Sequence, residues 1–326
     1  MRHLIGVTVA SCLALSVAAS GAWADLAEDC ARALQNPDLA IRACGDIISR
    51  NPSDAMARRY RGIALAAKKD IDDAIADFSE AIRLDPGNAV AFKERGNAYH
   101  RKVDYDRAIA DYSEAIKLDP GDASVYAWRA SSYSRKREHD RAIADYAEAI
   151  RLNPKDVMNY RGLAFSHYAK GDYNAVISDL SEAIRIDPGS SSAYCDRGLL
   201  YLWTGDYDRG IADFDAAINL KPDDGGPYAG RGYAFFKKGD SERALADLND
   251  AVRLVPDYVP AYAYRGEVFE ARGERAKAAD DYSRALSLSP ATDLQREMQD
   301  GVRRRLASLQ AAPPMPAPGA DRGGSR

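Results

Sequence analysis

Apolar residues in this chain recur with a helical period in short segments. Phe92, Gly96 and Tyr99 are spaced i, i+4 and i+7, and Ala108 and Tyr112 continue at i and i+4 on the next segment. Side chains at these intervals fall on one face of an α-helix. A polar turn separates the two segments, and a proline ends the second, so the pattern predicts helix hairpins.

The hairpin recurs with a period of 34 residues, which the prolines mark most clearly. They stand at positions 52, 86, 120, 154, 188, 222, 256 and 290. Three further columns keep this register: Ala five residues before each proline after the first, a bulky apolar residue eight before, and Gly or Ala 24 before. Small columns facing bulky ones are what closely packed helices require, so the pattern predicts tight stacking.

A 34-residue helix hairpin with Ala, aromatic and Pro residues in this register resembles the tetratricopeptide repeat. The resemblance implies an all-α fold, a right-handed superhelical solenoid of stacked hairpins. The seven expected units span 55–88, 89–122, 123–156, 157–190, 191–224, 225–258 and 259–292. Arg58 and His167 in an aromatic column, and Val176 and Gly210 in an alanine column, depart from the family pattern. We expect looser packing there and no break in the stack.

Shorter segments flank the seven units. Residues 25–54 suggest a degenerate helix hairpin, residues 293–310 a capping helix, and residues 311–326, rich in Pro, Gly and Ala, a disordered tail. In the expected cap an apolar stripe runs from Leu294 to Leu306, and the other face is rich in Arg and Glu. A polar outer face is what an open solenoid end requires.

Residues 1–24 have the composition of a secretory signal peptide. Arg2 begins a mostly apolar run too short to span a membrane, and an Ala-Trp-Ala sequence ends at Ala24. We expect cleavage after Ala24 and a periplasmic or secreted protein. The alternative is a lipoprotein, because small residues precede Cys12 in the pattern of a lipidated cysteine. That alternative would leave an unusually short leader.

Two cysteines, Cys30 and Cys44, lie one on each helix of the expected amino-terminal hairpin. In an exported protein such a pair can form a disulfide, which would stabilise a hairpin that has a neighbour on one side only. The alternative is that both are small buried residues. Cys195 has no obvious partner in the sequence.

Composition excludes several classes of protein. Lys and Arg number 45 against 49 Asp and Glu, and 46% of residues are hydrophobic, which argues against a disordered polyelectrolyte and a basic nucleic-acid binder. The sequence holds no His-Glu-x-x-His, Gly-x-Ser-x-Gly, phosphate-binding glycine loop or Cys-x-x-Cys motif. We therefore expect a protein that is not an enzyme and that has no cofactor and no metal.

Two charged columns recur with the fold period. An aspartate stands nine residues before each of seven prolines, and an arginine stands 25 before six of them. A catalytic group is needed once, whereas these groups recur, so we interpret them as structural ion pairs or capping contacts between neighbouring helices. In the fourth unit Leu163 replaces the arginine, and we expect the pair to be missing there.

The remaining face of each first helix varies between units, at 27, 23 and 20 residues before the proline. The resemblance implies that this face lines the concave side of the solenoid. Early units place polar and basic residues there, and three later units place pairs of large apolar residues. The expected groove residues are Lys93, Asn97, His100, Arg101, Phe165, Tyr168, Leu199, Leu202, Tyr233 and Phe236.

We expect this groove to bind a protein or peptide segment, with apolar anchors in the fourth to sixth units and carboxylates toward Lys93 and Arg101. The alternative is that the apolar residues only pack helix against helix. Lys93 and Asn97 also resemble half of a clamp by which some family members bind chaperone tails, but Trp128 and Gly162 stand where its polar partners would be.

The predicted function is therefore a non-catalytic scaffold or adaptor that binds no nucleic acid and has no membrane span. The alternative is a membrane-tethered assembly factor for a pilus, secretin or polysaccharide-export complex, anchored through Cys12.

Overall fold

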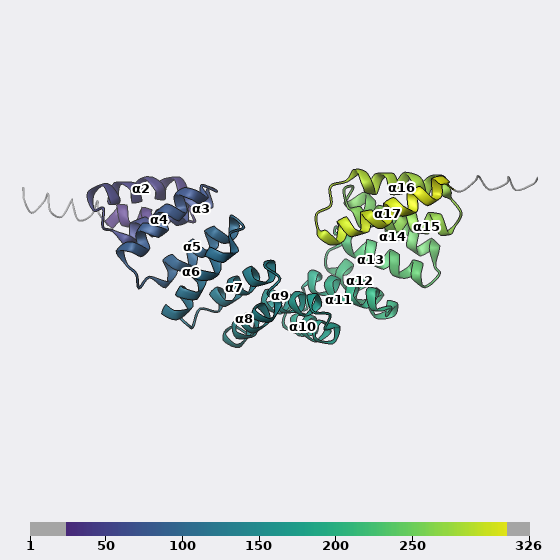
Figure 1. The fold of residues 1–326 in the computed structure, drawn as a ribbon, viewed down its shortest axis with the longest axis horizontal. Helices are drawn as coiled ribbons and strands as arrows, with labels where there is room; N and C mark the ends of the chain where they lie inside the picture. The colour runs from purple at the N-terminus through teal and green to yellow at the C-terminus, as the bar shows by residue number, and fades with distance from the viewer. Residues whose placement is uncertain (1–23, 312–326) are drawn as a thin grey trace, which may run out of the picture. The chain divides into compact units, whose positions relative to one another are not determined.

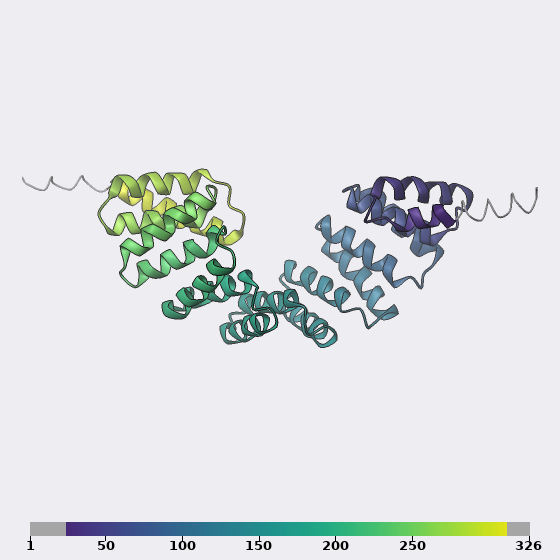
Figure 2. The same cartoon turned by 180° about the vertical axis from the view of Figure 1, so that it is seen from behind.

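The computed structural model describes residues 24–311, which are helical over most of their length and contain no strand. The chain divides into two units, Met1–Asp172 and Tyr173–Arg326. Within each unit, helices follow one another side by side in chain order (Figure 1), as the reverse view in Figure 2 also shows. The predicted all-α repeat fold is confirmed. The signal peptide, the Cys12 alternative and the tail from residue 312 lie outside the described residues.

The first unit begins with a helix at residues 24–31. Its other helices are α2 (Pro37–Arg50), α3 (Ala55–Ala67), α4 (Ile71–Leu84), α5 (Ala89–Arg101), α6 (Tyr105–Leu118), α7 (Ala123–Arg135), α8 (His139–Leu152) and α9 (Val157–Ala169). The second unit comprises α10 (Tyr173–Ile186), α11 (Ser191–Thr204), α12 (Tyr207–Leu220), α13 (Gly225–Lys237), α14 (Ser241–Leu254), α15 (Val259–Ala271), α16 (Arg275–Ser287) and α17 (Asp293–Ala311).

Local sequence determines where these helices begin. Asn36 accepts a hydrogen bond from the backbone N–H of Leu39 (3.2 Å), and Pro37 occupies the first turn of α2. Asp54 caps α3 in the same way through the N–H of Ala57 (2.8 Å). A side-chain oxygen satisfies one of the amide groups that the first turn leaves without a helical partner.

The packing columns are as tight as their residue types predicted. A Cβ atom added to Gly96 in α5 would lie 2.7 Å from Cε1 of Tyr112 in α6, closer than real Cβ atoms approach. Ala149 in α8 has no exposed surface. Larger side chains in these columns would have to displace their neighbours.

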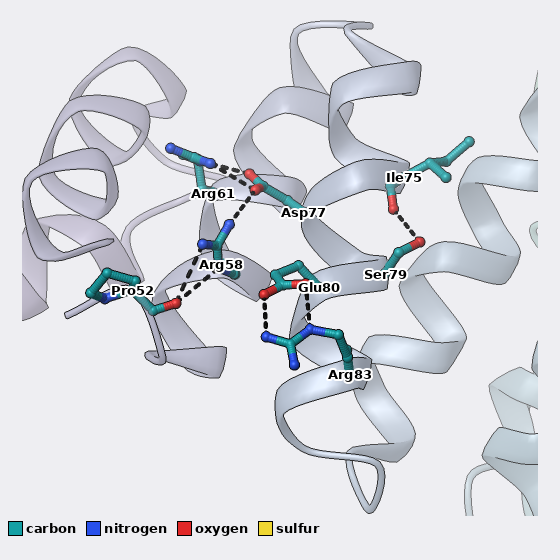
Figure 3. A network of polar contacts seen from close by, with 8 residues as sticks. All are labelled: Pro52, Arg58, Arg61, Ile75, Asp77, Ser79, Glu80 and Arg83. Atoms are coloured by element: carbon teal, nitrogen blue, oxygen red, sulfur yellow. Dashed lines mark hydrogen bonds and ion pairs between the residues drawn. The ribbon is translucent and has the colours of Figure 1, made fainter. Parts of the chain in front are cut away.

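The charged columns form ion pairs within each hairpin. Arg61 of α3 donates from Nε and Nη2 to both carboxylate oxygens of Asp77 in α4, at 2.6 and 2.7 Å (Figure 3). Arg58, the departure from the aromatic column, lies beside this pair and donates to the carbonyl of Pro52 at 3.3 Å. Equivalent pairs join Arg95 to Asp111, Arg129 to Asp145, Arg197 to Asp213, Arg231 to Asp247 and Arg265 to Asp281.

Most of these arginines also connect one hairpin to the next. Nη1 of Arg95 donates to Oγ of Ser79 in the preceding hairpin (3.1 Å), and Nη1 of Arg197 donates to Oγ of Ser181 (2.9 Å). The structural interpretation of the charged columns is thus confirmed for six units. In the fourth unit Leu163 is buried and provides no guanidinium.

The two ends of the described chain are secured differently. A disulfide joins Cys30 to Cys44, as expected, with a Cα–Cα distance of 4.9 Å. At the other end Val302 of α17 is buried, and Gln299 donates to the carbonyl oxygens of Ala285 (2.7 Å) and Leu288 (2.8 Å). These bonds satisfy carbonyl groups at the end of α16.

Candidate functional site

The first helices of unit 1, α3, α5, α7 and α9, expose a face that the hairpin core does not use. Exposure is concentrated 30, 26, 23 and 19 residues before the proline, at helical spacings of i, i+4, i+7 and i+11. We call this surface the unit 1 face. Its exposed members are Met56, Val90, Arg101, Trp128, Arg135, Met158, Phe165 and Ala169.

Sequence reasoning placed this face slightly off its true position. It used the columns 27, 23 and 20 residues before the proline, which lie toward the buried side of the first helices. Trp128 and Met158 were therefore missed as candidate surface residues. An extension of the helical period to a fourth position, i+11, would have found the correct stripe.

The predicted apolar anchors of unit 1 are exposed. Phe165 is 59% exposed, and Tyr168 is 36% exposed at the next turn of α9. Neither residue belongs to a buried core cluster. In α7, which packs against α9, Trp128 is 44% exposed. Three large apolar side chains are thus available on two neighbouring first helices.

The predicted apolar anchors of unit 2 are mainly packing residues. Leu202 is only 4% exposed and packs against Phe214 and Ala234, so it does not form part of an accessible groove. Leu199 joins the same cluster at its edge. The packing alternative therefore describes Leu202, because the bulky residues of adjacent hairpins enclose it.

Tyr233 and Phe236 are partly buried in unit 2. The ring of Tyr233 stacks on Tyr264 with centroids 4.0 Å apart, and Phe236 packs against the buried cluster around Leu248. Burial and the nearby carboxylate of Glu267 raise the pKa of Tyr233. The protonated hydroxyl donates a hydrogen bond to Glu267 at 3.2 Å.

Acidic residues on the first helix α15 are matched by the chain's own capping helix. Arg305 of α17 lies 3.3 Å from Glu267 and 2.9 Å from Glu270. Tyr282 donates a second hydrogen bond to Glu270 at 2.6 Å. These carboxylates are therefore held within unit 2.

Lys93 and Asn97, the residues that resemble half of a clamp, are committed to internal contacts. Nζ of Lys93 donates to Asp122 at 2.8 Å. Asn97 donates to Glu94 at 3.2 Å and accepts from the hydroxyl of Tyr112 at 2.9 Å. A partner would have to displace these bonds, so the structure gives no support to the clamp.

His100 lies half-buried between two first helices. Its Nδ1 is 2.9 Å from Oγ of Ser132, and its ring makes an edge contact with Trp128 at a centroid distance of 5.5 Å. Burial, and then the positive charge of Arg135, lower the pKa of His100 below its ordinary value of 6.5. The neutral imidazole thus supports the indole ring of Trp128.

Arg101 and Arg135 occupy the same column in successive units, and both are exposed. Nη1 of Arg101 donates to the carbonyl of Ala66 at 2.9 Å. Within residues 24–311, no carboxylate lies at ion-pair distance from either guanidinium. Their charges remain available at the surface.

Neither a metal centre nor a membrane span emerges from the part of the chain that the structure describes. No group of three or more His, Cys, Asp or Glu side chains there could hold a metal ion. None of its helices is long and apolar enough to cross a bilayer.

Comparisons with solved structures show the same fold elsewhere. A tetratricopeptide repeat protein from Parabacteroides merdae is 21% identical, with a TM-score of 0.63 over 78% of this chain and 100% of that one. PilF of Pseudomonas aeruginosa is 14% identical, with a TM-score of 0.56 over 67% of this chain and 99% of that one. Yeast Tom70 is 18% identical, with a TM-score of 0.56 over 84% and 58% of the two chains.

Sequence comparison identifies the repeat itself. No curated protein matches the chain. Models of the tetratricopeptide repeat match residues 29–89, 89–122, 123–156, 191–224 and 230–292, leaving out 157–190. These matches cover more than half of the sequence and coincide with the observed helix hairpins. The chain belongs to the tetratricopeptide repeat family.

Proposed function

We propose that this protein is a non-catalytic scaffold that binds a segment of another protein on the unit 1 face. The observation that carries the proposal is the exposure of Trp128 (44%) and Phe165 (59%) on the adjacent helices α7 and α9. Exposed apolar groups gathered on one surface mark interaction sites. Proteins of this repeat family generally act in protein–protein interactions, which agrees with the proposal.

Affinity capture with matched variants tests this function. The full mature chain is compared with Trp128→Ser/Phe165→Ser and with the control Leu118→Ser/Leu220→Ser, whose two leucines are each 44% exposed on second helices. Proteins lost with the first variant and retained by the control support the unit 1 face. Equal capture by all three chains would refute it.

We further propose that the protein works in the periplasm or outside the cell. The Cys30–Cys44 disulfide is compatible with an oxidising compartment. Mass spectrometry of the mature amino terminus tests this location. A chain beginning at Asp25 is expected, and a lipid-modified chain beginning at Cys12 would instead support a tethered assembly factor.

A further inference from the structure

The unit 1 face carries positive charge that the protein itself does not neutralise. Arg95 and Arg129, on the core side of α5 and α7, are held by the carboxylates of Asp111 and Asp145. Arg101 and Arg135, at the ends of the same two helices, have no such partner among residues 24–311. Each places a guanidinium, a planar donor suited to carboxylates, at the surface.

The nearest acidic groups on this face are already engaged. Asp122 accepts from Lys93 at 2.8 Å, and Glu94 accepts from Asn97 at 3.2 Å. Glu94 still contributes one negative charge, which is fewer than the two positive charges of the arginines. The face therefore presents a net positive field to an approaching chain.

Apolar groups adjoin these charges. The ring of Trp128 contacts His100, the residue before Arg101, and Trp128 precedes Arg135 by seven residues on the same face of α7. Phe165 and Met158, exposed by 59% and 64%, extend the apolar surface onto α9. Large aromatic side chains beside arginine are typical of residues that dominate binding energy at interfaces.

We propose that the occupant of the unit 1 face is an acidic protein segment that carries a large apolar side chain. Its carboxylates bind Arg101 and Arg135, and its apolar side chain packs against Trp128 and Phe165. This inference rests on the proposed scaffold function and adds the chemistry of the partner. Charge complementarity favours an acidic segment over a basic one.

Selection of peptides from a random library tests this chemistry directly. A phage-displayed library of short random peptides is selected on the full mature chain, and recovered peptides are titrated by fluorescence anisotropy. We expect enrichment of Asp and Glu together with Trp, Phe or Leu. Recovery of basic peptides, or of no peptide above background, would overturn the proposal.

Variants locate the binding chemistry. Arg101→Gln/Arg135→Gln is expected to weaken the recovered peptides about tenfold, in the range of two partly exposed ion pairs. Arg304→Gln, which removes an exposed arginine on α17, is the control and is expected to leave the affinity unchanged. Equal affinity of the double variant and the wild type would overturn the role of the two arginines.

Failure of this inference is distinguishable from failure of the scaffold function. If selection yields no acidic peptide while Trp128→Ser/Phe165→Ser still abolishes specific capture, the proposed partner chemistry is wrong and the scaffold function stands. If capture is also unaffected, both are wrong.

Discussion

Arg95 holds both carboxylate oxygens of Asp111, with Nε–Oδ2 and Nη2–Oδ1 distances of 2.8 and 2.7 Å. Its third guanidinium nitrogen reaches Ser79 of the preceding hairpin at 3.1 Å. One side chain thus connects two helices of its own hairpin and one of its neighbour. Because the connection recurs with the fold period, it contributes to the cohesion of each stack.

Removal of Arg95 should leave Asp111 buried without its counter-ion. We expect Arg95→Leu to lower the free energy of unfolding by about 3 kcal/mol, the cost of breaking a buried pair from one side. Urea denaturation measures the change. Arg95→Leu/Asp111→Leu should recover much of the loss, and an equally unstable double variant would show that buried charge is not the cause.

Gly96 and Gly45 should respond in opposite ways to the same substitution. Gly96→Ala would place a Cβ 2.7 Å from Tyr112, whereas a Cβ on Gly45 in α2 meets nothing within 4 Å. We expect Gly96→Ala to destabilise by about 1–3 kcal/mol through overpacking and Gly45→Ala to stabilise by about 0.5–1 kcal/mol through helix propensity. Thermal melts of both variants test the pair, and a neutral result for Gly96→Ala would mean that the column is not close-packed.

The disulfide should stabilise the amino-terminal end of unit 1. Cys30 and Cys44 enclose a loop with a sequence separation of 14 residues, and a loop of this length corresponds to about 3 kcal/mol in the chain-entropy description. We expect reduction to lower the stability of residues 24–50, measured as faster amide hydrogen exchange. Cys30→Ser/Cys44→Ser should not respond to reductant, and a response of that variant would assign the effect elsewhere.

His100 should make stability depend on pH. Its pKa in the folded protein lies below the ordinary 6.5, so the unfolded chain binds the proton more readily. Its stabilising contribution is therefore present above pH 6.5 and is lost as pH falls below that value. His100→Gln should flatten the fall in unfolding free energy between about pH 7 and about pH 5. Urea titrations with identical pH slopes for both chains would contradict this role.

The sequence predicted the fold more fully than the site because the two depend on different information. The proline register and the small and bulky columns are local repeats, and they specify which helix faces pack. The contact of Lys93 with Asp122 and that of Arg305 with Glu267 depend on how helices of different hairpins approach each other. Such contacts do not follow from residue spacing.

The position of the surface stripe was predicted only in part for the same reason. Phe165 was correctly placed on the exposed side of α9, but Leu202, chosen by the same rule, is buried against Phe214. A column three residues after Phe165's position lies at the boundary between the exposed and packed sides of a first helix. Whether a residue there is accessible depends on the size of its neighbours in the next hairpin.

Site-specific photo-crosslinking tests most directly whether the unit 1 face is the binding surface. A photoreactive residue is placed at Ala169, on that face, or at Ala147, an exposed position on the second helix α8. Crosslinking is carried out with the full chain in its native cell, and the products are identified by mass spectrometry. We predict a discrete partner crosslinked from Ala169 and none from Ala147. The same products from both positions, or products from Ala147 alone, would contradict binding on the first helices.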